Sequence, residues 1–448
     1  MDEIEAFRKR AEECRETILK MSYPLVVTHY DCDGLCAGAI VCKFLEENNI
    51  KYKLKIVRRL DDELLNSIKE ENEIIFSDLG GGNKKVNELE GNIVIFDHHQ
   101  TEGIKKLQLN PHLFNMDGSF DLSGSSCTYY SLEKLEEIAI VGAIGDMQYP
   151  LRGLNRKLLE KFQKEGIVEE KIDLKIYGRM SRPLVQLLAY SDDPYLPGLA
   201  NNEQRCAEFL ENNQIKKVFG HWPTYEELDE ESKKKLIGAL VSYLSDYYKN
   251  KIEPQYLIGP VYNLKRFKSI PELYDAGEFA TMLNACGRHK KEIIGLKICM
   301  GQMEFLEEGK KILNLHRKAL REGIEYAYNN INDFGSFLFL DGRGVIEDGI
   351  IGVVAGMVLG GIYKKPIVAI ALDENNNIKI STRATKELIK KGLNLGKILK
   401  EVCPKIGGIG GGHKIAAGAT IPRNKITEFL ELFETELKKQ IYTNSYTN

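Results

Sequence analysis

The chain lacks an apolar run long enough to cross a membrane, and it lacks an apolar segment at its start. Its longest apolar stretch, residues 349–363, is rich in glycine and has 15 residues, whereas a membrane helix needs about 20. We therefore interpret this stretch as a buried helix. Residues 1–10 are highly charged and do not resemble the apolar core of a secretory signal. We expect a cytoplasmic protein that makes no membrane contact.

Cys-x-x-Cys pairs and a strong excess of one charge are also missing. Nine cysteines are scattered without a Cys-x-x-Cys pair, so we interpret them as reduced and mostly structural. The net charge of −3 does not by itself indicate a nucleic-acid partner. What remains is an ordinary globular composition, 43% hydrophobic and 28% charged, and 448 residues suffice for two or three domains.

The first third of the chain alternates between short apolar strands and helical patterns. This alternation predicts an α/β fold with a parallel sheet covered by helices, in which ligands bind at the carboxyl ends of the strands. Residues 131–146 are expected to form one further helix. The predicted strands are 25–29, 52–57, 74–77 and 93–96, and the predicted helices between them are 34–48 and 61–70.

The rest of the chain predicts a helical extension, a connecting helix and a second, smaller α/β domain. The extension begins at about residue 151, and the long connecting helix covers 303–330. We place the domain boundaries at 1–300, 301–332 and 333–440, with the active site in a cleft between the first and last parts. The second domain is predicted from strands 336–341, 366–372 and 378–382, helices 349–363 and 386–401, and a glycine loop at 407–413.

Histidines and aspartates gather where the predicted strands end. His29, Asp31 and Asp33 follow the first strand at alternate positions, so on an extended chain their side chains point to one side. Alone, this motif fits a polar turn with a helix cap equally well. Asp78 alone fits a turn and Asp146 a helix end, but adjacent histidines after a buried strand are seldom packing residues. Besides the first cluster, the clusters are Asp78, Asp146 and the triplet Asp97, His98 and His99.

The convergence of these clusters predicts a metal site. Five carboxylates at one sheet edge would repel one another unless cations neutralise them. Mixed carboxylate and imidazole ligands suit Mn²⁺ or Zn²⁺ better than Mg²⁺. A pair of such ions would clamp a phosphoryl group and activate water, which is hydrolytic phosphate chemistry.

With these motifs the chain resembles the DHH phosphoesterases, most closely the RecJ-like single-strand exonucleases of the archaeal type. The first part carries His29-x-Asp31-x-Asp33-Gly34, Asp78, Asp97-His98-His99 and Gly145-Asp146. The last part carries Gly410-Gly-Gly-His413-Lys-Ile-Ala-Ala-Gly418 and Ser381-Thr-Arg383, like the DHH-associated domain. Between them, Leu283-Asn-Ala-Cys-Gly-Arg288 looks like the Asn-Ala-x-Gly-Arg segment of RecJ nucleases.

The resemblance implies two Mn²⁺ ions, with Mg²⁺ as an alternative. One ion would be held by His29, Asp31 and Asp78, and the other by Asp33, Asp78, His98 and Asp146. Asp97 would orient His98, and His99 would aid the phosphoryl oxygen or the leaving group. The phosphate backbone would be bound by Gly410, Gly411, Gly412, His413, Arg288 and Arg383. By itself the glycine run also fits a flexible loop.

The resemblance further implies hydrolysis of single-stranded DNA or RNA from an end, in DNA replication or repair. A short-oligonucleotide phosphodiesterase or mononucleotide phosphatase is the alternative enzyme. A replisome scaffold is a different class of function, because one eukaryotic replication factor keeps a degraded DHH domain. Here every ligand position is filled, which favours an enzyme but leaves room for docking to a replisome component or helicase.

Overall fold

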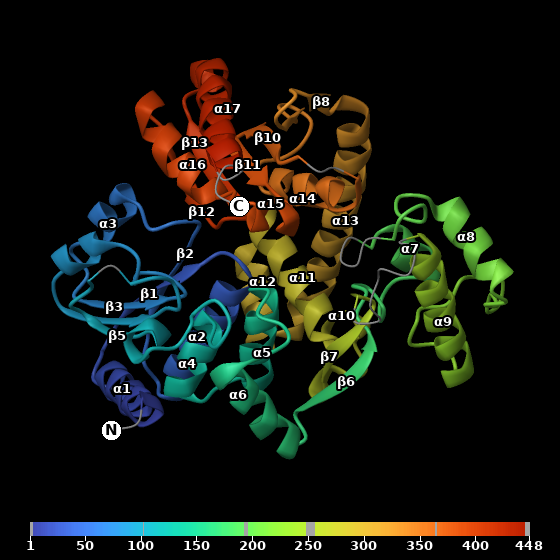
Figure 1. Cartoon of the computed structure of the whole chain (residues 1–448). Coiled ribbons are helices and arrows are strands. Elements are labelled where there is room, and N and C mark those ends of the chain that lie inside the picture. The colour runs from blue at the N-terminus through green and yellow to red at the C-terminus, as the bar shows by residue number, and fades with distance from the viewer. Residues whose placement is uncertain (1–2, 102, 192–195, 248–255, 363–364, 444–448) are drawn as a thin grey trace. The chain divides into compact units, whose positions relative to one another are not determined.

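The computed structural model describes residues 3–101, 103–191, 196–247, 256–362 and 365–443. It divides into two compact units (Figure 1). The first contains residues 1–188 and 204–313, and the second contains residues 189–203 and 314–448. Each unit is a helix-covered sheet, so the predicted α/β class is confirmed.

A five-stranded parallel sheet lies at the centre of the first unit, in the order β2-β1-β3-β4-β5. The chain passes from β1 to β2 on one side of β1 and then crosses to β3 on its other side. The switch point of the sheet therefore lies between β1 and β3. All carboxyl ends meet at one edge, and the residues after β1, β3 and β4 lie there. The strands are β1 (Leu25–His29), β2 (Lys53–Val57), β3 (Glu73–Ser77), β4 (Asn92–Phe96) and β5 (Leu107–Leu109).

Both faces of this sheet are buried, which explains why its strands read as nearly continuous apolar runs. Val26, Ile75 and Val94 lie on one face in a core with four helices, and Val27 and Phe76 lie on the other. The second face is covered by α3 (Asp62–Ile68) and the 3₁₀ turn Lys84–Glu88. The first is covered by α1 (Glu3–Ile18), α2 (Cys32–Glu47), α4 (Gly124–Leu132) and α5 (Glu136–Gly145).

The single helix expected at residues 131–146 is wrong. Two helices, α4 and α5, occupy this region and meet at a turn in which Glu133 and Leu135 have left-handed φ angles of 51° and 57°. Neither residue is a glycine, so the sequence carries no ordinary signal for the break. Its consequence is functional, because the separate helix α4 begins with its free N–H groups beside Asp33.

The remainder of the first unit is mostly helical, as predicted. A two-stranded antiparallel sheet joins β6 (Val168–Leu174) to β7 (Ile258–Leu264). Helix α11 (Ala276–Arg288) packs against α2 and α5 beneath the sheet edge. The other helices are α6 (Gly153–Lys164), α7 (Leu184–Ala189), α8 (Glu203–Asn212), α9 (Glu230–Tyr247), α10 (Pro271–Tyr274) and α12 (Glu292–Cys299).

The second unit contains a six-stranded mixed sheet in the order β12-β13-β11-β10-β9-β8. One face packs on α16 and α17, and the other packs on α14 and the end of the long helix α13. Tyr363, the expected last residue of α14, lies outside the described residues. The bounds are α13 (Leu306–Asn330), β8 (Asn332–Asp333), β9 (Leu338–Asp341), α14 (Ile351–Ile362), β10 (Ile367–Leu372), β11 (Ile378–Arg383), α15 (Lys386–Lys390), α16 (Leu395–Val402), β12 (Ile409–Gly412), β13 (Ala416–Ile421) and α17 (Ile426–Thr443).

Two predictions for the second unit need correction. The helix expected at 386–401 is split, because Gly392 has a φ of 96° and Asn394 caps the new helix α16. The glycine run is an edge strand, β12, paired with β13, and not a loop. A Cβ at Gly410 would lie 2.6 Å from the Cys403 Sγ, so glycine there permits close packing of the strand.

No helix among the described residues is long and apolar enough to span a bilayer. The stretch interpreted as a buried helix is α14, whose Ile351, Val354 and Val358 are fully buried against the second sheet.

The close approach of α2 to β1 makes a testable prediction for stability. A Cβ at Gly38 of α2 would lie 2.8 Å from the Thr28 Cγ2. We expect Gly38→Ala to lower the free energy of unfolding by about 1–3 kcal/mol, the usual cost of overpacking. Gly238→Ala, in the middle of α9 with open space around it, is the matched control and should raise the free energy by up to about 1 kcal/mol. Urea unfolding measures both, and an unchanged Gly38→Ala would contradict this packing.

Candidate metal centre

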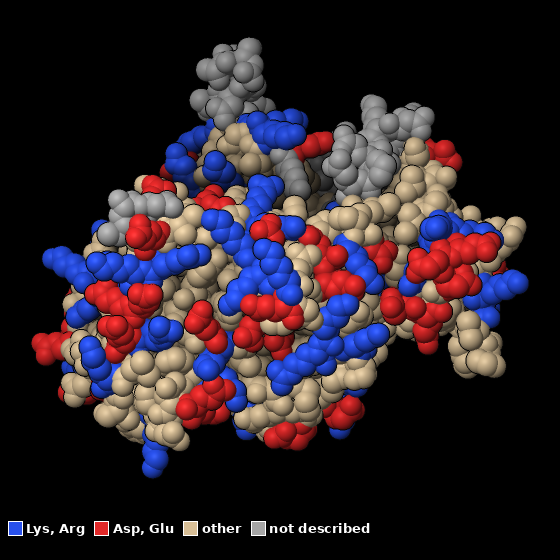
Figure 2. Space-filling view, turned by 90° about the horizontal axis from the view of Figure 1, so that it is seen from below, with Lys and Arg blue, Asp and Glu red and all other residues tan. Residues whose placement is uncertain are grey.

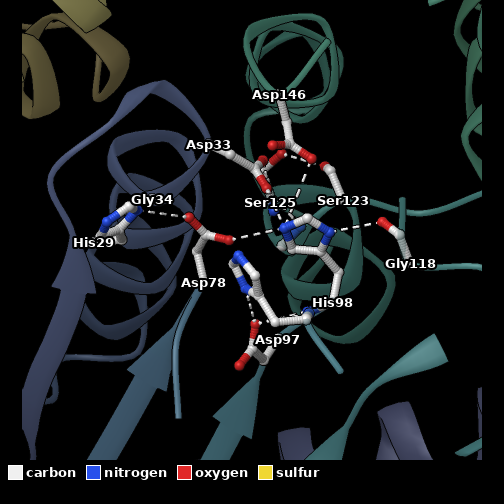
Figure 3. A network of polar contacts seen from close by, with 12 residues as sticks. His29, Asp33, Gly34, Asp78, Asp97, His98, Gly118, Ser123, Ser125 and Asp146 are labelled. Carbon is white, nitrogen blue, oxygen red and sulfur yellow. Dashed lines mark hydrogen bonds and ion pairs between the residues drawn. The ribbon is translucent and has the colours of Figure 1, made fainter. Parts of the chain in front are cut away.

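The side chain of Asp78 forms the middle of the site. Asp78 follows β3 with a left-handed φ of 60°, and its backbone N–H donates to the Phe96 carbonyl oxygen at 2.7 Å. The carboxylate is 1% exposed, yet neither oxygen has a hydrogen-bond partner. One oxygen faces the His29 Nδ1 at 3.4 Å and the other faces the His98 Nε2 at 3.3 Å (Figure 3). A buried carboxylate between two nitrogen donors is suited to bridge two cations.

The first group of possible metal ligands contains His29, Asp31 and Asp78, whose ligand atoms lie within 4.8 Å of one another. The His29 Nδ1 is 3.0 Å from an oxygen of Asp31. The other Asp31 oxygen accepts a hydrogen bond from the Gly34 N–H, as the N-cap of α2. The same residue therefore begins the helix and offers a ligand oxygen to the site.

The second group contains Asp33, His98 and Asp146, again with ligand atoms within 4.8 Å. The His98 Nε2 lies 3.9 Å from Asp33 and 3.6 Å from Asp146. Asp33 accepts hydrogen bonds from the N–H groups of Gly124 at 2.6 Å and Ser125 at 3.0 Å, at the start of α4. The helix terminus thereby favours the charged form of this buried carboxyl.

The role expected for Asp97 is corrected by the structure. The ring of His98 is held by the Gly118 carbonyl oxygen, 2.7 Å from Nδ1, which leaves Nε2 facing the carboxylates. Asp97 instead lies 2.8 Å from the Nδ1 of His99 and accepts from the N–H groups of His98 and Gly81. Asp97 therefore fixes the turn and the ring of His99, and only the backbone of His98.

The electrostatics show how strongly the site favours positive charge. Burial and the nearby charge of Asp78 raise the pKa of Asp33 to about 8. Burial alone would lower the pKa of His29 and of His98, but the surrounding carboxylates raise both well above the usual value. For Asp78 burial is opposed by the two histidines, which lower its pKa. Histidine protons thus balance the charge that divalent cations would balance better.

His99 forms a third group with Asp78 and His98, on the solvent side of the site. Its side chain is 52% exposed, whereas His98 is 7% exposed. Burial opposes protonation of His99, but the Asp97 carboxylate raises its pKa to about 9. Asp97 therefore holds the Nδ1 side of the His99 ring, and the rest of the ring is accessible to a ligand.

Arg288 lies beside the first group of ligands. The backbone of its neighbour Gly287 contacts Tyr30 so closely that a Cβ there would be 2.2 Å from the Tyr30 carbonyl oxygen. Asn284 accepts a hydrogen bond from the Cys32 N–H at 3.1 Å. Burial lowers the pKa of Arg288, although the charge of Asp31 counteracts it. An anion bound here would compensate this half-buried cation.

Two residues near the site were missed in the sequence. The guanidinium of Arg58, directly after β2, lies 5.3 Å from the ring centre of Tyr30. Gln148 donates to Asp146 at 2.9 Å and to the Gly118 carbonyl oxygen at 2.8 Å. The position of Arg58 after a strand of the same sheet was a usable signal, whereas nothing in the sequence distinguishes Gln148.

The remaining predicted site residues belong to the second unit. His413 is exposed after β12, and its N–H donates to the Ala416 carbonyl oxygen. Arg383 ends β11 and packs over Gly352 of α14. Gly410, Gly411 and Gly412 lie in the edge strand β12 and pair with β13 on one side. Within the described residues, none of these belongs to a group of possible metal ligands.

The position of Asp78 between the two groups of possible ligands predicts the effect of its removal on metal binding. We expect Asp78→Ala to weaken Mn²⁺ binding at both groups by more than about tenfold, since loss of even an outer-shell partner costs about 10–100-fold. Asp62→Ala, a substitution of an exposed aspartate paired with Lys85, is the matched control. Calorimetric titration with Mn²⁺ measures both, and a variant that still binds two ions tightly would contradict the bridge.

Three family models match successive parts of the chain. Residues 25–149 match the model of the DHH family N-terminal domain, which includes all the ligand groups described above. Residues 176–253 match the DHH-CID domain, and residues 335–439 match the DHHA1 domain. The models therefore cover the parallel-sheet domain, the helical extension and the second sheet.

The chain is also similar to proteins over nearly its whole length. An uncharacterized protein of Methanocaldococcus jannaschii, MJ0831, is 30% identical over 98% of this chain and 99% of its own. RecJ of Thermus thermophilus in complex with Mn²⁺ aligns with a TM-score of 0.60 at 16% identity, covering 97% of this chain, and this chain spans about half (55%) of that RecJ. The same RecJ in complex with Mg²⁺ aligns with a TM-score of 0.54 at 16% identity.

CDC45 of Entamoeba histolytica has a similar fold as well. It aligns with a TM-score of 0.64 at 13% identity, covering 98% of this chain and 99% of its own. At such identities a likeness shows the fold alone, whereas the full-length relative and the three domain models show ancestry. The chain belongs to the DHH family, and its fold is like that of RecJ.

Proposed function

We propose that the protein is a metal-dependent exonuclease that hydrolyses phosphodiester bonds from an end of single-stranded DNA or RNA. The observation that carries this proposal is the Asp78 carboxylate, buried and without hydrogen-bond partners between two groups of ligands. A structural aspartate at this depth would be expected to make hydrogen bonds to the protein. The RecJ-like fold, which belongs to a superfamily of phosphoesterases, supports the same reaction class.

The ligand set fits a pair of divalent cations. His29, Asp31 and Asp78 would hold one ion, and Asp33, His98, Asp146 and Asp78 the other. When bound, two such ions stabilise charge on the phosphoryl oxygens and make water a nucleophile at neutral pH. Mn²⁺ is favoured because two of the six ligands are imidazoles, and Mg²⁺ is the alternative. The solved complexes of the RecJ from Thermus thermophilus with either ion are consistent with this choice.

The surrounding residues would bind and orient the phosphate. The ring of His99, fixed by Asp97, can donate a hydrogen bond to a phosphoryl oxygen or to the leaving oxygen. Arg288 would hold a phosphate with its planar fork of donors, because partial burial disfavours its charge more than Asp31 stabilises it. Residues of the second unit, Arg383, His413 and Gly410–Gly412 of β12, would bind the nucleic-acid strand. The enzyme would act in DNA replication or repair.

A scaffold function is the second candidate, and the fold likeness to CDC45 favours it. Docking to a replisome component or helicase would fit such a role. The complete set of carboxylates and imidazoles argues for an enzyme instead, because a scaffold has no need to bury so many ionisable side chains in one place at this cost. Both roles can coexist in one protein.

Digestion of end-labelled strands tests the proposal. We expect the protein to shorten 5′- or 3′-labelled single-stranded DNA or RNA with Mn²⁺, to lose activity with EDTA, and to recover poorly with Ca²⁺, whose large flexible shell positions water badly. Asp78→Ala should abolish hydrolysis, and Asp62→Ala should not. Cleavage of dinucleotides alone would favour the short-oligonucleotide phosphodiesterase, and no cleavage of any strand would favour the scaffold.

His413 provides a test of the expected substrate role of the second unit. We expect His413→Ala to lower kcat/KM on a single strand by more than about tenfold, because it removes a donor to a phosphate oxygen. Mn²⁺ binding should stay unchanged, since His413 is absent from the ligand groups. His221→Ala, another exposed histidine, is the control. A collapse of Mn²⁺ affinity in a calorimetric titration of His413→Ala would show that His413 is a metal ligand.

A further inference from the structure

Large apolar side chains are exposed on the two segments that carry Gly118 and Asp146. Phe120 is 52% exposed, Met147 is 66% exposed and Tyr149 is 37% exposed. The guanidinium of Arg152, itself exposed, lies 5.7 Å from the ring centre of Phe120. We call these four residues the stacking rim. Their exposure is unfavourable in water, so a bound partner that covers them would stabilise the protein.

The stacking rim and the metal ligands share one hydrogen-bond network. Met147 directly follows the ligand Asp146. Gln148 donates both to Asp146 and to the Gly118 carbonyl oxygen, which also holds the ring of His98. These contacts fasten the segment 117–121 to the segment 146–155, which carry the four rim residues between them.

Two further contacts hold the two segments together. The Asn155 N–H donates to the Asp121 carbonyl oxygen at 2.9 Å, and the Asn155 amide donates to Gln148 at 2.7 Å. Asn155 and Gln148 are fully or nearly fully buried, so the rim stands on an ordered base. The rim is therefore an ordered surface with a fixed position relative to His98 and Asp146.

The backbone at Met147 is held in a conformation that favours glycine. Its φ is +62°, in the left-handed region, and its N–H donates to the Ile144 carbonyl oxygen at 3.0 Å. Glycine would fit this turn with less strain, whereas methionine directs a long, polarizable side chain into solvent. Strained residues of this kind cluster at ligand-binding sites.

We propose that the stacking rim binds a nucleobase of the strand whose phosphate lies at the metal centre. The inference rests on the proposed function and names the part of the substrate that the metal ligands cannot hold. Aromatic faces, a thioether and a guanidinium stack on the flat face of any base. Such contacts do not read base edges, so binding should depend on the presence of a base and little on its identity. A protein partner that covers the same side chains is the competing occupant.

Binding is tested with a fluorescent base in place of the terminal one. A short single strand with 2-aminopurine at its end is titrated with the protein in Ca²⁺, so that hydrolysis is slow. We expect stacking to quench the fluorescence, and we expect Phe120→Ala to remove most of the quenching. Phe219→Ala, which truncates a phenylalanine 98% exposed on a separate hairpin, is the matched control and should quench like the unmodified protein. Equal quenching by all three proteins would overturn the proposal.

Kinetics with an abasic end provide the second test. In Mn²⁺ the unmodified protein should show about a tenfold lower KM for a strand with a terminal base than for one with an abasic end, as expected for one stacked base. Phe120→Ala and Met147→Ala should raise KM for the normal strand towards the abasic value and leave kcat within about twofold, since neither residue is a metal ligand or proton donor. Tyr149→Phe should retain the preference, because its ring remains.

The outcomes separate this inference from the proposed function. Equal KM values for normal and abasic ends would overturn base stacking while strand cleavage still supports the exonuclease. Rim-dependent quenching without cleavage of any strand would overturn the exonuclease and still support a base-binding rim. Quenching that Phe120→Ala leaves intact, together with loss of a copurifying protein from that variant, would assign the rim to the protein partner instead.

Discussion

Buried negative charge at the carboxyl edge of one parallel sheet is the constraint on which the rest of the structure depends. Asp33, Asp78 and Asp97 are each no more than 2% exposed, and Asp146 is close by. Asp33, Asp97 and Asp146 accept hydrogen bonds from the protein, whereas the Asp78 oxygens accept none. Asp33 is held by the start of α4 and Asp97 by backbone N–H groups, whereas Asp78 faces only histidines. Bound cations would therefore supply the contacts that the Asp78 carboxylate lacks within the protein.

Small residues allow these charges to come so close together. A Cβ at Gly142 of α5 would lie 2.1 Å from the Ser125 Oγ and 2.5 Å from an oxygen of Asp33, and a Cβ at Gly124 would lie 2.6 Å from Asp78. Gly34 likewise lets α2 begin directly under His29. The glycines thus bring two helices against the ligands, and the packing of the core and the geometry of the metal centre depend on the same residues.

Much of the first unit could be predicted because its signals are local. Strands β1, β3 and β4 are apolar runs. β1 ends at His29, and β3 and β4 end just before Asp78 and Asp97, so parallel topology alone brings those residues together. The break between α4 and α5 could not be predicted, because left-handed Glu133 and Leu135 carry no glycine signal. The orientation of His98 by the Gly118 carbonyl was equally hidden, since a backbone acceptor leaves no trace in the sequence.

In the glycine run of the second unit, the sequence carried a signal that predicted the wrong structure. Five glycines within residues 407–412 favour a loop by composition, yet Gly410 to Gly412 pair in register with β13. The reason is steric: Gly396 at the start of α16 and Gly410 in the strand remove the side chains that would keep helix and strand apart. Composition therefore indicated flexibility where tertiary packing had removed it.

Substrate stacking and metal geometry are mechanically linked through the Gly118 carbonyl oxygen. This oxygen accepts from the His98 ring and from the Gln148 amide at once, and Gln148 also reaches Asp146. A displacement of the segment that carries Phe120 would therefore change the position of the His98 nitrogen that faces Asp78. Conversely, cations that fix His98 and Asp146 would fix the rim through the same bonds. A base stacked on Phe120 and a phosphate at the metal centre would then lie at a fixed separation, because the same hydrogen bonds hold the groups that bind them.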